Sequence, residues 1–167
     1  MHDKLTQSDI DKMQEEIDHR KLVVRKAAIE AVKEARAQGD LSENFEYYAA
    51  KREKNINESR IRYLEAMIKT AIIVEDQSGE DEVGLNKRVT IQVEDEEETE
   101  EYKIVTTVRG NSLNGLITPE SPLGKALMGH KVGDTVLVQV NDKVSYYVEI
   151  RKIENTGEEE TDTLRKF

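Results

Sequence analysis

Two long stretches of helical periodicity, separated only by a short turn, constrain the fold of this chain more than any other feature. Apolar residues recur three and four positions apart across 9–38 and again across 42–74, and no proline interrupts either stretch. Gly39 and Asp40 stand between them, so the connection is short enough to make the helices antiparallel neighbours. The sequence therefore predicts a helical hairpin of residues 1–75, about 45 Å long at about 1.5 Å per residue.

The packed faces predicted for the two helices differ in character. On the first helix, which we expect Ser8 to cap, a single charged residue interrupts the stripe. On the second, the stripe is apolar at the base of the hairpin and becomes small or polar toward the turn. The first stripe comprises Ile10, Met13, Ile17, Arg20, Val24, Ala27 and Ala31, widened by Val23, Ala28, Ile29, Val32 and Ala35. The second comprises Tyr47, Ala50, Lys54, Asn57, Ile61, Leu64, Ile68 and Ala71.

The second half of the chain changes to the period-two alternation of strands. Ser121, Pro122 and Gly129 have the spacing of an N-cap, a first helical residue and a C-terminal glycine around one short helix. The alternation predicts antiparallel strands at 87–94, 102–108, 135–140 and 145–153. We therefore expect an α+β chain: the hairpin, a polar linker at 76–85, a domain at 86–154 with an antiparallel sheet and one short helix, and a mobile tail at 155–167.

Composition and charge narrow the classes of function. The chain has no cysteine, which excludes disulfides and thiolate metal sites. It has no apolar run of the roughly 20 residues that a membrane span needs and no signal-peptide pattern, so we expect a cytoplasmic location and no membrane partner. Residues 76–167 hold 11 Lys/Arg against 20 Asp/Glu, while 1–75 are nearly balanced. Because an acidic surface repels phosphate, we expect no sequence-specific binding of duplex DNA.

The turn of the hairpin carries two carboxylates, Asp40 and Glu43, within the segment 39–46. One interpretation is a capping box, in which Asp40 caps the second helix and Glu43 reaches back to it. The other is metal chemistry at the tip of a rod. Mg²⁺ takes one or two carboxylates and keeps several waters, so this pair could share an ion with a second site that supplies further ligands. There the ion could activate a water or stabilise a leaving oxygen.

These motifs resemble those of the bacterial Gre transcript-cleavage factors, the GreA/GreB-type transcription elongation factors, and the likeness is greatest to the GreA type. The resemblance covers nearly the whole chain except the tail. At the tip it rests on Gly39-Asp-Leu-Ser-Glu-Asn44, Glu46-Tyr47 and Ala49-Ala50-Lys51. In the second half it rests on Tyr102-Lys-Ile-Val105, Ser121-Pro122-Leu-Gly124 and Val132-Gly-Asp134.

The resemblance implies a coiled-coil hairpin and an FKBP-like C-terminal domain that docks on bacterial RNA polymerase. The hairpin would enter the secondary channel of the polymerase, where the tip acids help to hold a Mg²⁺ ion and the polymerase cleaves backtracked nascent RNA. By position these acids are Asp40 and Glu43, with Ser42 and Asn44 shaping the tip. The chain would then be no enzyme itself, but an accessory factor that lends metal ligands to another enzyme.

Other readings stay open at this point. The cations near the tip, Arg36, Lys51 and Arg52, could contact the phosphates of the displaced RNA 3′ end, or could be ordinary solvated helix charges. The chain departs from the family pattern at Arg20, Lys26, Phe45 and 106–111. A non-cleaving regulator that binds the same channel, or a plain coiled-coil adaptor, are the alternatives. The presence of both Asp40 and Glu43 favours a cleavage factor over a non-cleaving regulator. Their place at a solvent-facing turn disfavours a plain adaptor.

Overall fold

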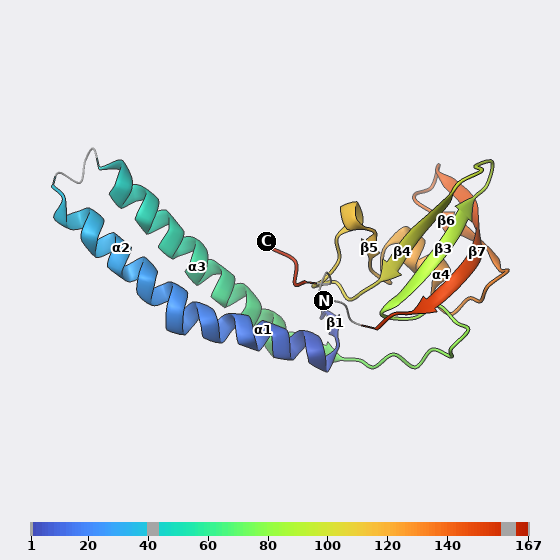
Figure 1. The fold of residues 1–167 in the computed structure, drawn as a ribbon, viewed down its shortest axis with the longest axis horizontal. Coiled ribbons are helices and arrows are strands. Elements are labelled where there is room, and N and C mark those ends of the chain that lie inside the picture. Colours follow the sequence, from blue (N-terminus) through green and yellow to red (C-terminus); the bar gives the residue numbers. More distant parts are fainter. Residues whose placement is uncertain (1, 40–43, 158–162, 167) are drawn as a thin grey trace. The chain divides into compact units, whose positions relative to one another are not determined.

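The structure, a computed structural model, describes residues 2–39, 44–157 and 163–166. The chain forms two units: one holds the residues before Lys4 together with 7–72, and the other holds 4–6 and 73–166. Figure 1 shows a pair of long helices in the first unit and a twisted sheet with a short helix in the second.

The first arm of the hairpin is helical from Gln7 to Ala37, but it is not one uniform α-helix. It consists of α1 (Gln7–His19), a π-helical turn η1 (Arg20–Val24) and α2 (Arg25–Ala37). At the end of η1 the amide of Arg25 donates to the carbonyl of Arg20, five residues back instead of four. The arm also begins at Gln7, so Ser8 lies inside it and is not the predicted N-cap.

The π turn shifts the packed face of the first arm by one residue. The stripe predicted from the sequence continues through Ala27 and Ala31, but both are exposed. Ala28 and Val32 are half-buried instead, and Ala35 is buried. Because the π turn contains one more residue than an α-turn, every later position is displaced by one. The predicted seam is therefore correct as far as Val24 and wrong at Ala27 and Ala31, where the residues predicted only to widen it, Ala28 and Val32, take over.

The second arm, α3 (Phe45–Thr70), is a regular α-helix, and the seam predicted for it is confirmed. Asn57, Ile61 and Leu64 are buried, and the remaining seam positions within the helix are half-buried. The helix ends at Thr70, before the predicted Val74. The strand β2 (Ile72–Ile73) follows and pairs with β1 (Lys4–Leu5), a two-stranded sheet that the sequence did not predict.

A polar cluster joins the two arms where α1 meets the π turn. Glu16 accepts hydrogen bonds from Arg20 Nε at 2.8 Å and from Arg60 Nε at 2.7 Å, and Asn57 Oδ1 accepts one from Arg20 Nη1 at 3.0 Å. Burial opposes ionisation of Glu16, but the hydrogen bonds from Arg60 and Arg20 outweigh it, so the pKa of this carboxyl lies below its ordinary 4.5. The cluster replaces an apolar layer of the seam with charge-assisted hydrogen bonds.

The second unit is built on a five-stranded mixed sheet. All neighbouring strands are antiparallel except β4 and β5, which are parallel. The order is β5-β4-β3-β7-β6, with β3 (Lys87–Val93), β4 (Thr99–Ile104), β5 (Leu116–Ile117), β6 (Thr135–Gln139) and β7 (Ser145–Asn155). The prediction of a wholly antiparallel, four-stranded sheet is thus wrong at one edge, where β5 adds a short parallel strand. The second predicted strand also lies three residues too late.

One face of this sheet carries the core and the helix α4 (Pro122–Leu127). As predicted, Ser121 caps α4: its Oγ accepts from the amide of Gly124 at 3.1 Å. Val83, inside the predicted linker, is fully buried in the core. The ammonium of the buried Lys87 donates to the carbonyls of Gly79 and Glu82, which ties this part of the linker to the sheet. Residues 79–83 therefore pack as part of the second unit.

The described residues of the predicted mobile tail are hydrogen-bonded to the second unit. β7 continues to Asn155, and the ammonium of Lys103 donates to the carbonyl of Gly157 at 2.6 Å. Farther on, the amide of Arg165 donates to the carbonyl of Val108 at 2.6 Å. These residues of the tail thus have hydrogen-bond partners in the second unit, and the mobility of the tail stays a prediction.

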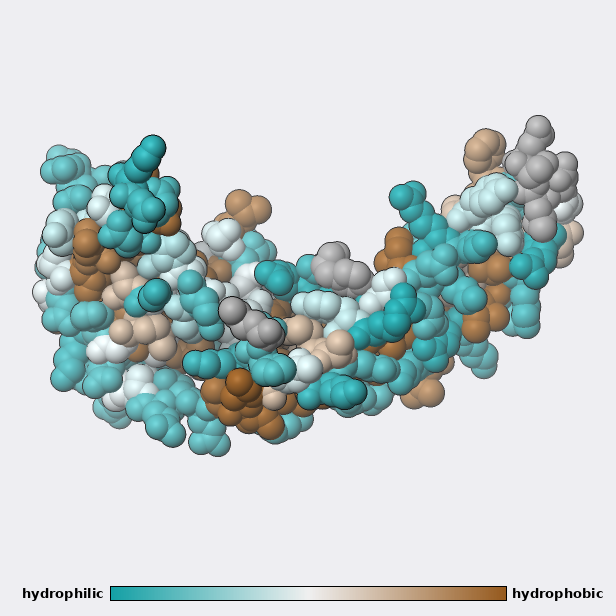
Figure 2. Space-filling view, turned by 180° about the vertical axis from the view of Figure 1, so that it is seen from behind, coloured by the Kyte–Doolittle hydropathy of each residue, from teal (hydrophilic) through white to brown (hydrophobic). Residues whose placement is uncertain are grey.

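None of the helices within the described ranges is long and apolar enough to cross a membrane. Hydrophilic side chains dominate the surface in Figure 2, with separate hydrophobic patches between them.

The polar cluster predicts an acid-sensitive contribution to hairpin stability. Glu16→Gln should lower the free energy of unfolding by about 1–2 kcal/mol at pH 7, because it weakens charge-assisted hydrogen bonds from two arginines. Since the folded-state pKa of Glu16 is depressed, its contribution is full above 4.5 and is lost as the pH falls through the folded-state pKa. Thermal unfolding from pH 7 to 3 measures this. Glu15→Gln, at an exposed carboxylate, is the control; an equal loss in both variants would contradict the assignment.

Candidate functional site

The described residues on both sides of the tip form a frame around positions 40–43. Asp40, Ser42 and Glu43, three of the predicted tip residues, lie outside the described residues. Gly39, where the first arm ends, has a φ of +124°, which side-chain-bearing residues rarely adopt. The backbone conformation at position 39 therefore favours glycine, the residue from which the end of the first helix was predicted.

Asn44 is the residue that connects the two arms next to the tip. Its Oδ1 accepts a hydrogen bond from the amide of Tyr47 at 3.0 Å, which makes it the N-cap of α3. Its Nδ2 donates to the carbonyl of Ala35, the buried residue near the end of α2, at 2.6 Å. One side chain therefore caps the second arm and holds the end of the first.

This cap bears on the capping-box interpretation of the acidic pair. The capping box required Asp40 to cap a helix that starts at about Ser42. The helix starts instead at Phe45, and Asn44 supplies the cap. α3 therefore does not take its cap from the predicted box, and the two members of that box, Asp40 and Glu43, lie outside the described residues.

Arg36 and Tyr47 make a second contact between the arms beside Asn44. The Arg36 guanidinium lies over the Tyr47 ring at 5.6 Å from its centroid, a cation–π arrangement. A hydrogen bond from Arg36, opposed by burial, lowers the pKa of the Tyr47 hydroxyl. The sequence suggested Arg36 as an RNA contact and Tyr47 as a packing residue; the structure shows them as partners.

The other two cations near the tip lie on the outer face of α3. Lys51 and Arg52 are exposed and line a shallow hollow of about 440 Å³ with Tyr48, Asn55, Ile56 and Ser59. No acidic residue lines it among those that the structure describes. Cations interleaved with an exposed aromatic ring suit a single-stranded nucleic acid, whose phosphates and bases they can contact together. Sequence reasoning found the cations but missed Asn55 and Ile56, since an exposed isoleucine on a helix gives no local signal.

The described residues offer no alternative metal centre. Outside the gaps at 40–43 and 158–162, no three His, Cys, Asp or Glu side chains are grouped closely enough to hold an ion.

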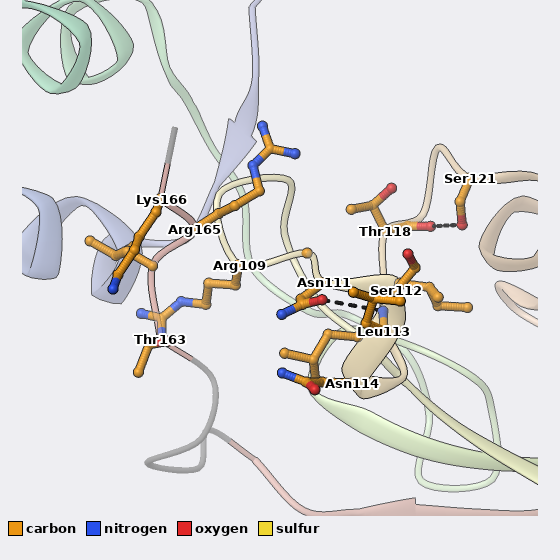
Figure 3. Close-up of a pocket in the computed structure, with 14 residues that line it drawn as sticks. Arg109, Asn111, Ser112, Leu113, Asn114, Thr118, Ser121, Thr163, Arg165 and Lys166 are labelled. Carbon is orange, nitrogen blue, oxygen red and sulfur yellow. Dashed lines mark hydrogen bonds between the residues drawn. The ribbon is translucent and has the colours of Figure 1, made fainter. Parts of the chain in front are cut away.

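The second unit has a pocket of about 700 Å³ beside β5, and its lining includes Ser121, the N-cap of α4. The loop that follows β4 and the segment 163–166 line it, and its described lining contains cations but no carboxylate. In Figure 3 the Arg109 side chain extends toward Thr163, while Asn111 and Ser121 make local hydrogen bonds within their own loops. Leu113, on the rim, is 95% exposed. This surface includes part of 106–111, where the chain departs from the family pattern.

Comparison with known proteins covers both units. Residues 4–73 match the family model "Transcription elongation factor, N-terminal", and 77–155 match "Transcription elongation factor, GreA/GreB, C-term". The chain is 41% identical over 149 residues to transcription elongation factor GreA of Macrococcus caseolyticus, covering 89% of this chain and 94% of the relative. It is 42% identical over 154 residues to GreA of Streptococcus pneumoniae serotype 19F, covering 92% and 96%. Among solved structures, the GreA factor homolog 1 of Thermus thermophilus is 28% identical, covering 92% of this chain and 99% of that one, with a TM-score of 0.43.

Substitutions at Asn44 should separate its two hydrogen bonds. Asn44→Asp keeps an oxygen that can cap α3 but loses the donor to Ala35, and should reduce the free energy of unfolding by about 1 kcal/mol. Asn44→Ala loses both bonds and should reduce it by about 2 kcal/mol. Urea unfolding followed by circular dichroism measures both, with Asn55→Asp as an exposed control. If Asn44→Asp unfolds as the wild type does, the bond to Ala35 does not stabilise the tip.

Proposed function

The chain belongs to the GreA/GreB family of transcription elongation factors, and on that premise we propose that it stimulates bacterial RNA polymerase to cleave backtracked nascent RNA. The hairpin enters the secondary channel, and Asp40 and Glu43 help to hold a Mg²⁺ ion at the active site of the polymerase. The chain acts as an accessory factor and does not hydrolyse RNA alone. A polymerase partner also places it in the bacterial cytoplasm.

The observation that carries this proposal is the cap of α3. Because Asn44 caps the helix and also holds Ala35, the second arm needs no cap from the acidic pair. Two carboxylates leave most of the octahedral shell of Mg²⁺ to other ligands, which suits an ion shared with polymerase carboxylates and RNA phosphate oxygens. The ion can then activate a water and stabilise the leaving oxygen of a phosphodiester.

The outer face of α3 suits the displaced RNA 3′ end. Lys51 and Arg52 contact its phosphates, and Tyr48, which is 52% exposed, offers a ring on which a base can stack. Arg36 contributes its charge from the other arm while it remains over Tyr47. None of these groups reads base edges, so the contact is independent of RNA sequence.

The second unit docks on the polymerase through the rim of the pocket beside β5. In a half of the chain with an excess of nine acidic residues, the described lining of this pocket holds Arg109, Arg165 and Lys166 and no acid. Leu113 projects from its edge. An exposed leucine beside cations offers a partner surface an apolar contact with a charged rim around it.

Substitution of the tip acids tests the metal role. Asp40→Asn and Glu43→Gln remove the charge that Mg²⁺ requires and keep nearly the same size. Each should reduce cleavage of RNA in backtracked complexes by about a hundredfold or more, as removal of a catalytic electrostatic group does. Affinity for the polymerase should change less than threefold, because docking does not use these residues.

Three results would each contradict part of this proposal. Cleavage near the wild-type level in Asp40→Asn would exclude a metal role for Asp40. A wild-type protein that binds the polymerase and leaves the RNA at full length would favour the alternative, a channel-binding regulator that does not promote cleavage. Hydrolysis of RNA by polymerase-free protein would exclude the accessory role.

A substitution on the pocket rim tests the docking face. Leu113→Ser should raise the Kd for RNA polymerase about tenfold, because it removes an apolar anchor from the contact. Val144→Ser, at an apolar residue that is 49% exposed in the loop between β6 and β7, should change the Kd less than twofold. Competition binding with labelled wild-type protein measures both. Equal effects of the two substitutions would place the docking face elsewhere.

A further inference from the structure

The π turn in the first arm solves a mismatch between the two helices of the hairpin. Along α3 the packed positions follow a regular alternation of three and four residues, from Tyr47 to Ile68. Along the first arm the same alternation holds up to Arg20, and then three successive intervals of four residues lead to Val32. Between Arg20 and Val32 the first arm thus contains one residue more than the regular spacing of packed positions on α3 would allow. In an α-helix one residue turns the helix by about 100°, enough to carry Ala35 off the packed face.

The extra residue is taken up between Arg20 and Arg25, and the three middle residues of the turn, Lys21, Leu22 and Val23, are exposed. Leu22 is 74% exposed and Val23 is 54% exposed, although both are apolar and Val23 was predicted to widen the packed stripe. In Figure 2 the surface of the hairpin is mainly hydrophilic, with hydrophobic patches interrupting it. Two apolar side chains therefore face solvent at the position of the extra residue.

Two neighbouring residues of α3 hold the turn at both of its ends. At its start, Asn57 Nδ2 donates to the Arg20 carbonyl at 3.3 Å and Asn57 Oδ1 accepts from Arg20 Nη1 at 3.0 Å. This carbonyl is also the acceptor of the five-residue hydrogen bond from Arg25. At the end, Arg25 binds both oxygens of Glu58, with Nε to Oε1 at 2.7 Å and Nη2 to Oε2 at 2.9 Å. Two consecutive residues of α3, Asn57 and Glu58, therefore bind two residues of the first arm that are five positions apart, Arg20 and Arg25.

The consequence of the turn reaches the tip of the hairpin. Because the packed face moves by one residue, Ala35 is 6% exposed and its carbonyl accepts from Asn44 Nδ2. The end of α2 and the start of α3 are joined by this bond on either side of the tip. If the first arm were a regular α-helix throughout, Glu34 would take the place of Ala35 on the packed face. The hydrogen bond from Asn44 to the Ala35 carbonyl would then be lost.

We propose that Asn57 and Glu58 form a register clamp: by holding Arg20 and Arg25 they fix the π turn, and so set the rotation of α2 where it meets the tip. These four residues are positioning residues for transcript cleavage, because the carboxylates that act there follow α2 directly in the chain. The inference rests on the proposed function for its catalytic part. The rotation of α2 is a property of the protein alone and can be measured without the polymerase.

Thiol labelling measures the rotation. The chain has no cysteine, so single substitutions give a clean signal. In the clamped register Ala31→Cys, at an exposed position, should react with a maleimide at least about tenfold faster than Ala35→Cys, at a buried one, in line with the free energy of opening a packed site. Similar rates at the two positions in otherwise wild-type protein would overturn the register.

Changes in the length of the turn test whether rotation matters for cleavage. Deletion of Leu22 removes the extra residue and gives an unbroken helix whose packed face still includes Ala35, so the labelling contrast and cleavage should stay within about threefold of the wild type. Insertion of one alanine after Leu22 adds a second extra residue at the same place. It should abolish the labelling contrast and reduce cleavage about a hundredfold, because small displacements of catalytic groups have effects of that size. Equal losses from deletion and insertion would indicate that length alone matters and would overturn the proposal.

Substitution of the clamp and its rescue complete the test. Asn57→Leu with Glu58→Gln should weaken the labelling contrast and cleavage together, while binding to the polymerase stays within threefold. Deletion of Leu22 in the same variant should restore both, because an unbroken helix needs no clamp. If Asn57 and Glu58 only stabilised the fold, deleting the exposed Leu22 would not restore cleavage in this variant. Restored labelling without restored cleavage would overturn the positioning role and leave the register itself established, so the two failures can be told apart.

Discussion

The hairpin depends on hydrogen bonds that let two helices of unequal length pack along one seam. Apolar contacts dominate near its base, where Met13, Ile17 and Leu64 are buried. Farther along, the seam contains charged and amide groups, and these must be satisfied because unpartnered polar groups are costly to bury. Arg20 and Asn57 meet this requirement through Glu16 and the Arg20 carbonyl, and Arg60 donates from Nε and Nη2 to the two oxygens of Glu16. The contacts of Arg20 and Asn57 also hold the π turn, which contains the extra residue of the first arm. The same hydrogen bonds therefore satisfy polar groups in the seam and set the geometry of the tip.

The regular parts of this fold could be predicted from the sequence because they follow from a single periodic pattern. The seam of α3 and the cap and first turn of α4 are of this kind. The π turn could not be predicted, because the first arm carries apolar residues at both Ala27 and Ala31 and at Ala28 and Val32. Both stripes are apolar over these four residues, and the structure shows Asn57 and Glu58 of the other helix holding the turn that leads into the second stripe. The strand β5 was missed for a different reason: two residues are too few to show an alternation.

The tip shows how local pattern and tertiary contact can disagree. Asp40 and Asn44 are both residue types that cap helices, and the sequence alone permits either. Asn44 has the additional ability to donate a hydrogen bond, and it uses this to reach Ala35 on the other arm. An aspartate has no such donor. The tertiary contact thus explains why α3 starts at Phe45, and it leaves the acidic pair outside the capping of that helix.

Membership of the GreA/GreB family and the geometry of the hairpin converge on an accessory role in transcript cleavage. The central claim is tested most directly by the length of the RNA in a halted, backtracked elongation complex. The account predicts that the purified protein, added with Mg²⁺, shortens the RNA from its 3′ end and allows the polymerase to resume. RNA that stays at full length while the protein is bound to the complex would contradict the claim.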